Sequence, residues 1–269
     1  MIRRLSMLIL LSLALAAAPA PAGAPIGVTS IRQAGEPLDP SIQNEVVHAV
    51  DLAADWLAAH QSADGSWGSE TDRVTRTSVA LLALTARASR HSDACARAAV
   101  WLDGHIPSTN ELFAAHAWRI IALLSAAPDT PARTNLTRRL LQEAGLCASA
   151  TDGWLLGQLL WNDALTLAGQ PPLPLPENRA QTLKLEARKW PPAPSLPPGC
   201  LWTPVYLISR LSGGTLTRDG EPLDWRRDAA QILINAQRRD PSGGGFWGAS
   251  ERSDRAWQTA FGILTLLEL

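Results

Sequence analysis

One short pattern occurs near both ends of the chain and constrains its fold more than any other feature. Gln61 is followed by a turn and then by Trp67-Gly68, and Gln237 is followed by a glycine-rich turn and then by Trp247-Gly248. In both copies an apolar segment precedes the Gln, and Asp-Arg with a second apolar segment follows the Trp-Gly. A weaker trace of the first copy occurs at Trp101-Leu102, which matches Trp56-Leu57. The pattern predicts a repeated unit of two helices joined by a turn.

Hydrophobic spacing along the chain is typical of helices. In the first segment Val47, Val50, Ala54 and Leu57 fall three or four residues apart, which places them on one face of a helix. No segment shows the alternation of apolar and polar residues that indicates a strand. The sequence therefore predicts an all-α fold, with helices at about 44–61, 75–88, 94–103, 111–126, 134–146, 153–168, 178–189, 201–212, 224–237 and 254–268.

These helices form about five pairs. A single pair cannot bury its apolar face alone, so successive pairs are expected to stack side by side. The second helix of each complete unit (75–88 and 254–268) is apolar nearly all round, as a helix buried on every side should be. We therefore expect an inner set of helices surrounded by an outer set.

The Gln, turn, Gly-x-Trp-Gly pattern resembles the repeat of the terpenoid cyclase and protein prenyltransferase superfamily, which includes the squalene–hopene cyclases. The resemblance is good in residues 53–84 and 229–266 and implies an α/α toroid, as a partial or complete barrel of about five helical hairpins. It also implies that Gln61 with Trp67, and Gln237 with Trp247, stack and hydrogen-bond across neighbouring outer helices. We call these four residues the clasp residues and expect their role to be structural.

The catalytic motifs of the superfamily are missing. The chain has no Asp-x-Asp-Asp acid motif of the squalene–hopene cyclases. The zinc motif of the prenyltransferases would place Cys two residues after Asp254, but Ala256 stands there, and Val74 stands at the matching position of the first copy. Asp93-Ala94-Cys95 spells the motif without the preceding turn. Since zinc requires thiolate or imidazole ligands, we expect no metal and no cofactor.

Several polar and aromatic residues on apolar helices are candidates for lining a cavity, namely His116, Asp163, Trp118, Trp161 and Trp257. A carboxyl group buried at Asp163 would have a raised pKa and could act as an acid. Alternatively, Asp163 faces solvent or pairs with an arginine, and His116 is a hydrogen-bonded core residue. The chain has eleven Trp but three Phe and one Tyr; if several of the Trp rings face one cavity, they would suit an isoprenoid or a sugar ring.

The first residues have the composition of an export signal. A basic start, an apolar run and an Ala-Pro-Ala exit predict a signal peptide at 1–22, followed by a flexible tether at 23–42 and the helical domain at 43–269. The apolar run is shorter than the roughly 20 residues of a membrane span, so we expect no such span in the mature chain. An uncleaved anchor is the alternative. We expect an exported protein, periplasmic or extracellular, in which Cys95, Cys147 and Cys200 leave the pairing of any disulfide open.

The charge balance argues against nucleic acid as a partner. The chain carries 24 basic and 25 acidic residues, and removal of residues 1–22 leaves 22 against 25. A nucleic-acid-binding domain would carry clustered basic residues and a high isoelectric point.

Two functions fit the sequence. The first is a non-catalytic binding or interaction module, whose partner is an apolar, isoprenoid-like ligand, a glycan or a protein. The alternative is an enzyme, either a divergent terpenoid cyclase or a carbohydrate-active toroid that uses acids such as Asp152 and Asp163.

Overall fold

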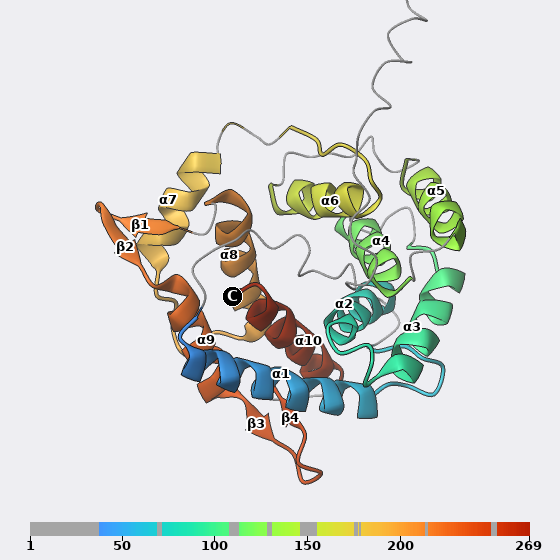
Figure 1. Ribbon diagram of the computed structural model, residues 1–269, viewed down its shortest axis with the longest axis horizontal. Helices are drawn as coiled ribbons and strands as arrows, with labels where there is room; N and C mark the ends of the chain where they lie inside the picture. Colours follow the sequence, from blue (N-terminus) through green and yellow to red (C-terminus); the bar gives the residue numbers. More distant parts are fainter. Residues whose placement is uncertain are drawn as a thin grey trace, which may run out of the picture.

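The computed structural model describes residues 38–68, 72–107, 113–127, 131–145, 155–174, 177, 179–212, 215–248 and 252–269. This part of the chain is mostly helical, which confirms the all-α prediction (Figure 1). Its helices are α1 (Pro40–Ala59), α2 (Arg73–Thr85), α3 (Ser92–Gly104), α4 (Phe113–Ala126), α5 (Pro131–Gly145), α6 (Leu155–Leu167), α7 (Arg179–Lys189), α8 (Pro198–Leu211), α9 (Trp225–Ala236) and α10 (Arg252–Leu267).

The helical domain begins earlier than predicted. The Asp39 carboxylate accepts a hydrogen bond of 2.9 Å from the backbone N–H of Ser41, and Pro40 takes the first helical position, where no donor is needed. Residues 40–42, which the sequence assigned to the tether, therefore belong to α1. The predicted signal peptide at 1–22 and the tether up to residue 37 lie outside the described residues.

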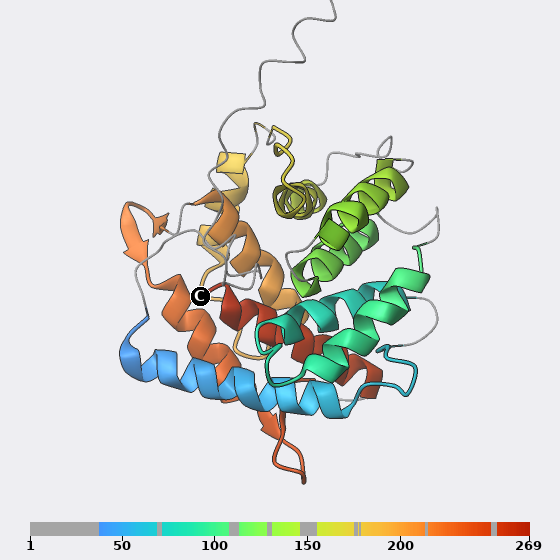
Figure 2. The same ribbon diagram turned by 45° about the vertical axis from the view of Figure 1, so that its right-hand side comes forward.

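Two short hairpins interrupt the helices and were not predicted. β1 (Leu216–Arg218) pairs with β2 (Glu221–Leu223) across the turn Asp219-Gly220, and β3 (Arg238–Arg239) pairs with β4 (Gly245–Phe246). Strands of two or three residues are too short to show alternation in the sequence. The residues that the second copy has in addition between Gln237 and Trp247 form the β3–β4 hairpin, which projects from the body of the molecule below α1 (Figure 2).

The even-numbered helices pack against one another in a closed order. α2 packs on α4, α4 on α6, α6 on α8, α8 on α10, and α10 returns to α2. The odd-numbered helices lie outside them: α1 on α2 and α10, α3 on α2 and α4, α5 on α4, α7 on α8, and α9 on α10 (Figure 1). In agreement with the predicted all-round burial, every residue of α2 from Thr77 to Thr85 is buried.

Two further sequence expectations concern the membrane and the cysteines. No helix in the described ranges has the length and apolar character needed to cross a bilayer. Cys95 is buried and Cys200 is exposed, and both are free thiols, so these two cysteines do not pair with each other. Cys147 lies outside the described residues.

Candidate functional site

The two tryptophan turns have the same hydrogen bonds. The indole N–H of Trp67 donates to the carbonyl oxygen of Leu57 in α1 at 3.0 Å, and that of Trp247 donates to Leu233 in α9 at 2.9 Å. The backbone N–H of each Trp donates to a threonine hydroxyl on the following helix, Thr77 or Thr259, at 3.1 Å. Each Trp thus joins its turn to the preceding helix through the indole N–H and to the following helix through its backbone N–H.

The two glutamines connect each turn to a helix of another pair. The side-chain amide of Gln61 donates to the carbonyl oxygens of Gly65 at 2.8 Å and of Ala94 in α3 at 2.9 Å. The amide of Gln237 donates to the carbonyl oxygen of Ala49 in α1 at 2.8 Å. The first pair is therefore bound to the second pair, and the last pair to the first. These amides and indoles all donate to backbone carbonyls. The stacking of each Gln on its Trp, and a hydrogen bond between the two side chains, stay predictions.

Glycine is required where these turns contact their neighbours. Gly65 has φ +93°, and a Cβ there would lie 2.7 Å from the carbonyl oxygen of Arg97 in α3. A Cβ at Gly245 would lie 2.6 Å from the amide nitrogen of Gln237. At Gly65 the added atom would collide with the backbone of α3, whereas at Gly245 it would collide with the amide of Gln237, which would have to shift.

The α3–α4 pair satisfies the matching carbonyl with an arginine. Arg119, buried in α4, donates through Nε to the carbonyl oxygen of Leu102 at 2.9 Å, where Trp67 donates to Leu57 in the first pair. The ends of α1 and α3 also resemble each other. His60 stacks on Trp56 at the end of α1, and His105 stacks on Trp101 at the end of α3, each with ring centroids 3.9 Å apart. Sequence reasoning missed Arg119, although a lone arginine in an apolar helix was a visible signal.

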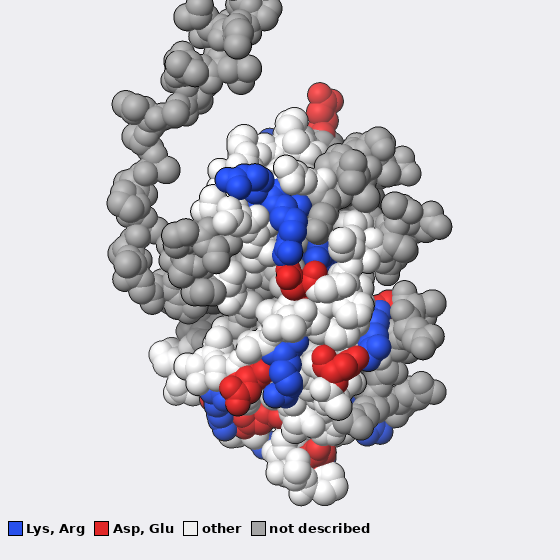
Figure 3. Space-filling model, turned by 90° about the vertical axis from the view of Figure 1, so that its right-hand side faces the viewer, with Lys and Arg blue, Asp and Glu red and all other residues white. Residues whose placement is uncertain are grey.

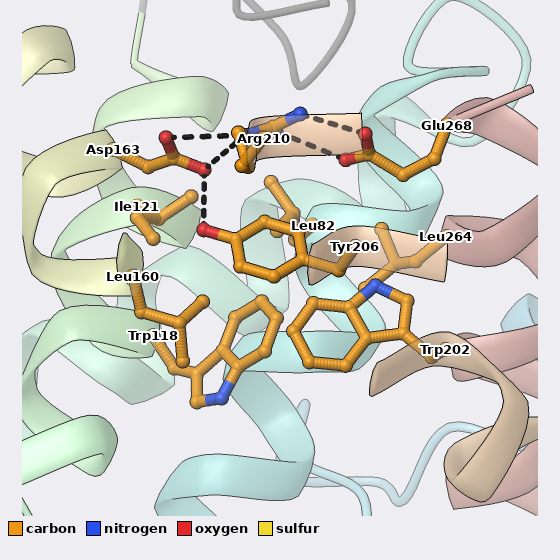
Figure 4. A pocket seen from close by; sticks show the side chains of 10 residues that line it. All are labelled: Leu82, Trp118, Ile121, Leu160, Asp163, Trp202, Tyr206, Arg210, Leu264 and Glu268. Carbon is orange, nitrogen blue, oxygen red and sulfur yellow. Dashed lines mark hydrogen bonds and ion pairs between the residues drawn. The ribbon is translucent and has the colours of Figure 1, made fainter. Parts of the chain in front are cut away.

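A pocket lies among the even-numbered helices, and each of the five contributes to its wall (Figure 4). The space between the lining side chains is about 300 Å³ with open solvent included, but only about 20 Å³ of it is accessible to a water-sized molecule, which is room for about one water. Its walls are mostly apolar and aromatic. The lining residues are Leu82, Trp118, Ile121, Leu160, Asp163, Trp202, Tyr206, Arg210, Leu264 and Glu268.

One end of the pocket carries a buried charged network. Arg210 donates through Nε to Asp163 at 3.2 Å, and through its two terminal nitrogens to Glu268 at 2.8 and 3.0 Å. The Tyr206 hydroxyl donates to Asp163 at 2.7 Å, and the Ser209 hydroxyl donates to Glu268 at 3.0 Å. Figure 4 shows Arg210 between the two carboxylates, with the indoles of Trp118 and Trp202 at the opposite end.

Burial and charge shift the pKa values of this network. Burial raises the pKa of Asp163, and the guanidinium of Arg210 opposes that shift without cancelling it. Burial also raises the pKa of Tyr206, and the Asp163 carboxylate adds to the effect. For Arg210, burial lowers the pKa, but Glu268 and Asp163 outweigh it and hold the pKa above its ordinary value. Arg210 therefore stays charged, and Asp163 is the carboxyl that takes up a proton more readily than usual.

The structure brings together only part of the predicted cavity set. Asp163 and Trp118 line the pocket, and Asp163 pairs with an arginine, one of the alternatives that the sequence left open. His116 and Trp161 are buried but do not line this pocket. Trp257 is half-buried and packs edge-on against Phe261. Tyr206, Arg210 and Glu268 are lining residues that the sequence did not indicate, and Asp152 lies outside the described residues.

A second hollow lies on the outer surface between α3, α4 and α5. It encloses about 1220 Å³, open solvent included, and is lined by Ala99, Val100, Asp103, Leu123, Ala126, Ala127, Arg133, Asn135, Leu136 and Arg139. On this side of the molecule basic and acidic side chains alternate with apolar and uncharged surface (Figure 3). An ion pair between Arg139 and Asp103 joins α5 to α3 across the hollow.

No cluster suited to a metal ion occurs in the part of the chain that the structure describes, where no three His, Cys, Asp or Glu side chains gather. Comparison of the chain with protein-family models, with curated proteins and with solved structures finds no match. The function must therefore be argued from the pocket itself.

Proposed function

We propose that this protein is an exported α/α toroid of the terpenoid cyclase type that acts as a non-catalytic module and binds a small, mainly apolar ligand. One observation carries the proposal: all five even-numbered helices contribute side chains to a single, mostly apolar pocket. The closed packing order, in which α10 returns to α2, supports the toroid architecture.

The arrangement of the charges supports binding over catalysis of sugar hydrolysis. Glycoside hydrolysis requires two carboxyl groups that flank the scissile bond, with space between them for the substrate and water. Here the guanidinium of Arg210 lies between Asp163 and Glu268 and bonds to both. A carbohydrate-active mechanism through these two acids would first have to displace a buried arginine.

A divergent cyclase is the second candidate, and one observation favours it. Asp163 is a buried carboxyl with a raised pKa in an aromatic-lined pocket, and such a group can donate a proton to an apolar substrate. The test is incubation of the protein with squalene, followed by mass spectrometry of the extract. A cyclic product that disappears in Asp163→Asn would establish this function, whereas an inactive wild type would eliminate it.

Ligand binding is tested with geraniol as the probe, by ligand-observed NMR on the mature chain. We expect geraniol to bind the wild type by displacing side chains that line the pocket, to lose binding in Leu160→Phe because the larger ring occupies that space, and to bind Leu185→Phe unchanged, since that site is exposed. If neither geraniol nor smaller apolar alcohols bind, the proposed function is wrong.

Export is tested separately. The protein recovered from outside the cytoplasm should begin at Gly23 when its N-terminus is sequenced. Recovery of the full-length chain from the cytoplasm alone would contradict the prediction of a cleaved signal.

A further inference from the structure

α6 is the least firmly packed of the inner, even-numbered helices. It packs extensively on α4, but it approaches α8 closely at far fewer positions than any other two neighbouring inner helices approach each other. In the part of the chain that the structure describes, α5 packs on α4 and α7 on α8, and neither packs extensively on α6. Each of the other four inner helices packs against at least one outer helix. α6 therefore has a single extensive helix contact, the one with α4.

An extended segment, residues 170–174, covers the outer side of α6 in place of a helix (Figure 1). The backbone N–H of Leu173 donates to the side chain of Asn162 at 2.7 Å, and the amide of Asn162 donates to the carbonyl oxygen of Leu173 at 2.9 Å. The amide of Gln158 donates to the carbonyl oxygen of Pro174 at 2.6 Å. These bonds join α6 to its own continuation, so they do not hold it on the rest of the ring.

Asp163 connects α6 to α8 across the wall of the pocket (Figure 4). Its carboxylate accepts hydrogen bonds from the hydroxyl of Tyr206 at 2.7 Å and from Nε of Arg210 at 3.2 Å. Arg210 is bound independently to Glu268, at 2.8 and 3.0 Å. If Asp163 releases its two partners, α8 stays attached to the end of α10, and α6 alone is free to move.

The pocket needs such a movement before it can hold more than a water. Only about 20 Å³ of it is accessible to a water-sized molecule, which is room for about one water. Leu160 and Asp163 of α6 form part of its lining, so displacement of α6 from α8 widens it. Elements with few buried contacts open at the lowest cost in free energy.

We propose that the ring of inner helices opens between α6 and α8, when Asp163 releases Tyr206 and Arg210, and that this opening admits the ligand to the pocket. The opening itself follows from the packing of α6. Its use as an entry route rests on the proposed binding function. α6 moves together with residues 170–174, while the contacts of α2 with α4 and α10 stay closed.

The opening is tested by amide hydrogen exchange with mass spectrometry on the mature chain, without any ligand. In the wild type the amides of α6 should exchange about tenfold faster than those of α2. Asp163→Asn should accelerate the exchange of α6 about tenfold further and leave α2 unchanged, because a neutral amide holds the guanidinium less strongly than a carboxylate does. Glu268→Gln is the matched control: it removes a carboxylate from the same guanidinium, but on the side of α10, and should not accelerate α6.

Each result of the exchange experiment decides the question. Equal protection of α6 and α2 in the wild type would overturn the opening. Acceleration of every helix alike in Asp163→Asn would overturn it too, because it would indicate global destabilisation. If Asp163→Asn does not fold, Tyr206→Phe decides, since it removes only the hydroxyl that bonds to Asp163. It should accelerate α6 selectively, by about threefold, and unchanged exchange of α6 would contradict the role of Asp163.

The entry route is tested with geraniol as the probe. The association rate of geraniol, obtained from NMR line shapes, should be about threefold higher in Tyr206→Phe than in the wild type, in parallel with the faster exchange of α6. An unchanged association rate beside faster exchange would overturn the entry route and leave the proposed binding function in place. If geraniol does not bind at all, the proposed function and the entry route are both wrong, while the opening is still decided by the exchange experiment.

Discussion

The first and last helical pairs are built differently from the pairs between them. α1–α2 and α9–α10 are joined by tryptophan turns, in which a neutral indole donates to a carbonyl near the end of the outer helix. In the α3–α4 pair a buried arginine makes the equivalent connection, since Arg119 donates to Leu102 near the end of α3. Arg133 of α5 makes a different one, because it donates to Leu124 and Ala127 at the end of the inner helix α4. The carbonyls of Leu57, Leu102 and Leu233 each also accept a backbone N–H at the helix end, so the side chain supplies a second donor to each.

The comparison shows that the repeat preserves a hydrogen bond and not a residue type. An indole N–H and a guanidinium Nε–H fill the same role, at 3.0 Å to Leu57 and 2.9 Å to Leu102. The arginine carries a charge that the indole does not, so the two kinds of connection should respond differently to mutation.

The largest effect is expected at the tryptophan turns. Trp67→Ala and Trp247→Ala should each lower the free energy of unfolding by about 3–5 kcal/mol, because each removes a fully buried aromatic ring and its hydrogen bond. Urea denaturation measures the loss. Trp257→Ala is the control, since that ring is only half-buried and should cost less. An equal loss at all three positions would show that the turns have no special role.

Arg119→Met should cost about 1–3 kcal/mol, because it retains most of the side-chain volume but leaves the buried carbonyl of Leu102 without this donor. The same denaturation experiment on Arg138→Met, whose side chain is exposed, should show almost no change. If the two variants are equally stable, the equivalence between Arg119 and Trp67 is wrong.

The threonines of the two turns should give a smaller and matched effect. Thr77→Val and Thr259→Val each remove a hydroxyl that contacts the backbone N–H of the turn Trp, at a cost of about 1 kcal/mol. Thr217→Val, on an exposed strand position, serves as the control. Thermal melts that separate the two turn variants by several degrees would contradict the symmetry of the two units.

A pH series distinguishes the neutral turns from the charged pocket. The pKa of Asp163 is raised in the folded protein, so the folded state binds this proton more tightly than the unfolded state. Its contribution to the free energy of unfolding is therefore largest at low pH and declines as the pH rises from the ordinary value of 3.8 through the raised one. The difference in the free energy of unfolding between the wild type and Asp163→Asn should increase on acidification in that range. The difference between the wild type and Thr77→Val should not change with pH. If the difference between the wild type and Asp163→Asn does not depend on pH, Asp163 does not have a raised pKa in the folded protein.

The sequence predicted the helical class and the positions of the helices because hydrophobic spacing and proline directly reflect backbone structure. It also identified the turns, since a Gln followed by a glycine-containing turn and Trp-Gly is distinctive enough to align, although the second copy has additional residues between Gln and Trp. It missed both hairpins, whose strands are too short to alternate, and it placed the start of α1 too late because Asp39-Pro40 was assigned to the tether.

The pocket was only partly predictable for a different reason. Asp163 and Trp118 stood out as polar or bulky residues on apolar helices, but Tyr206, Arg210 and Glu268 acquire their role from packing between α6, α8 and α10. Glu268 lies 58 residues from the arginine it pairs with. Contacts of that range depend on which helices become neighbours, and a single sequence does not contain that information.

The return of α10 to α2 has a consequence for how the molecule comes apart. In an open row of helical repeats the two outermost units have one neighbour each, and they fray before the rest melts. Here Gln237 bonds to α1, and α10 contacts α2, so the first and last pairs each have neighbours on both sides. Loss of any one pair would expose two of its neighbours at once, which favours a single cooperative transition over stepwise melting from the termini.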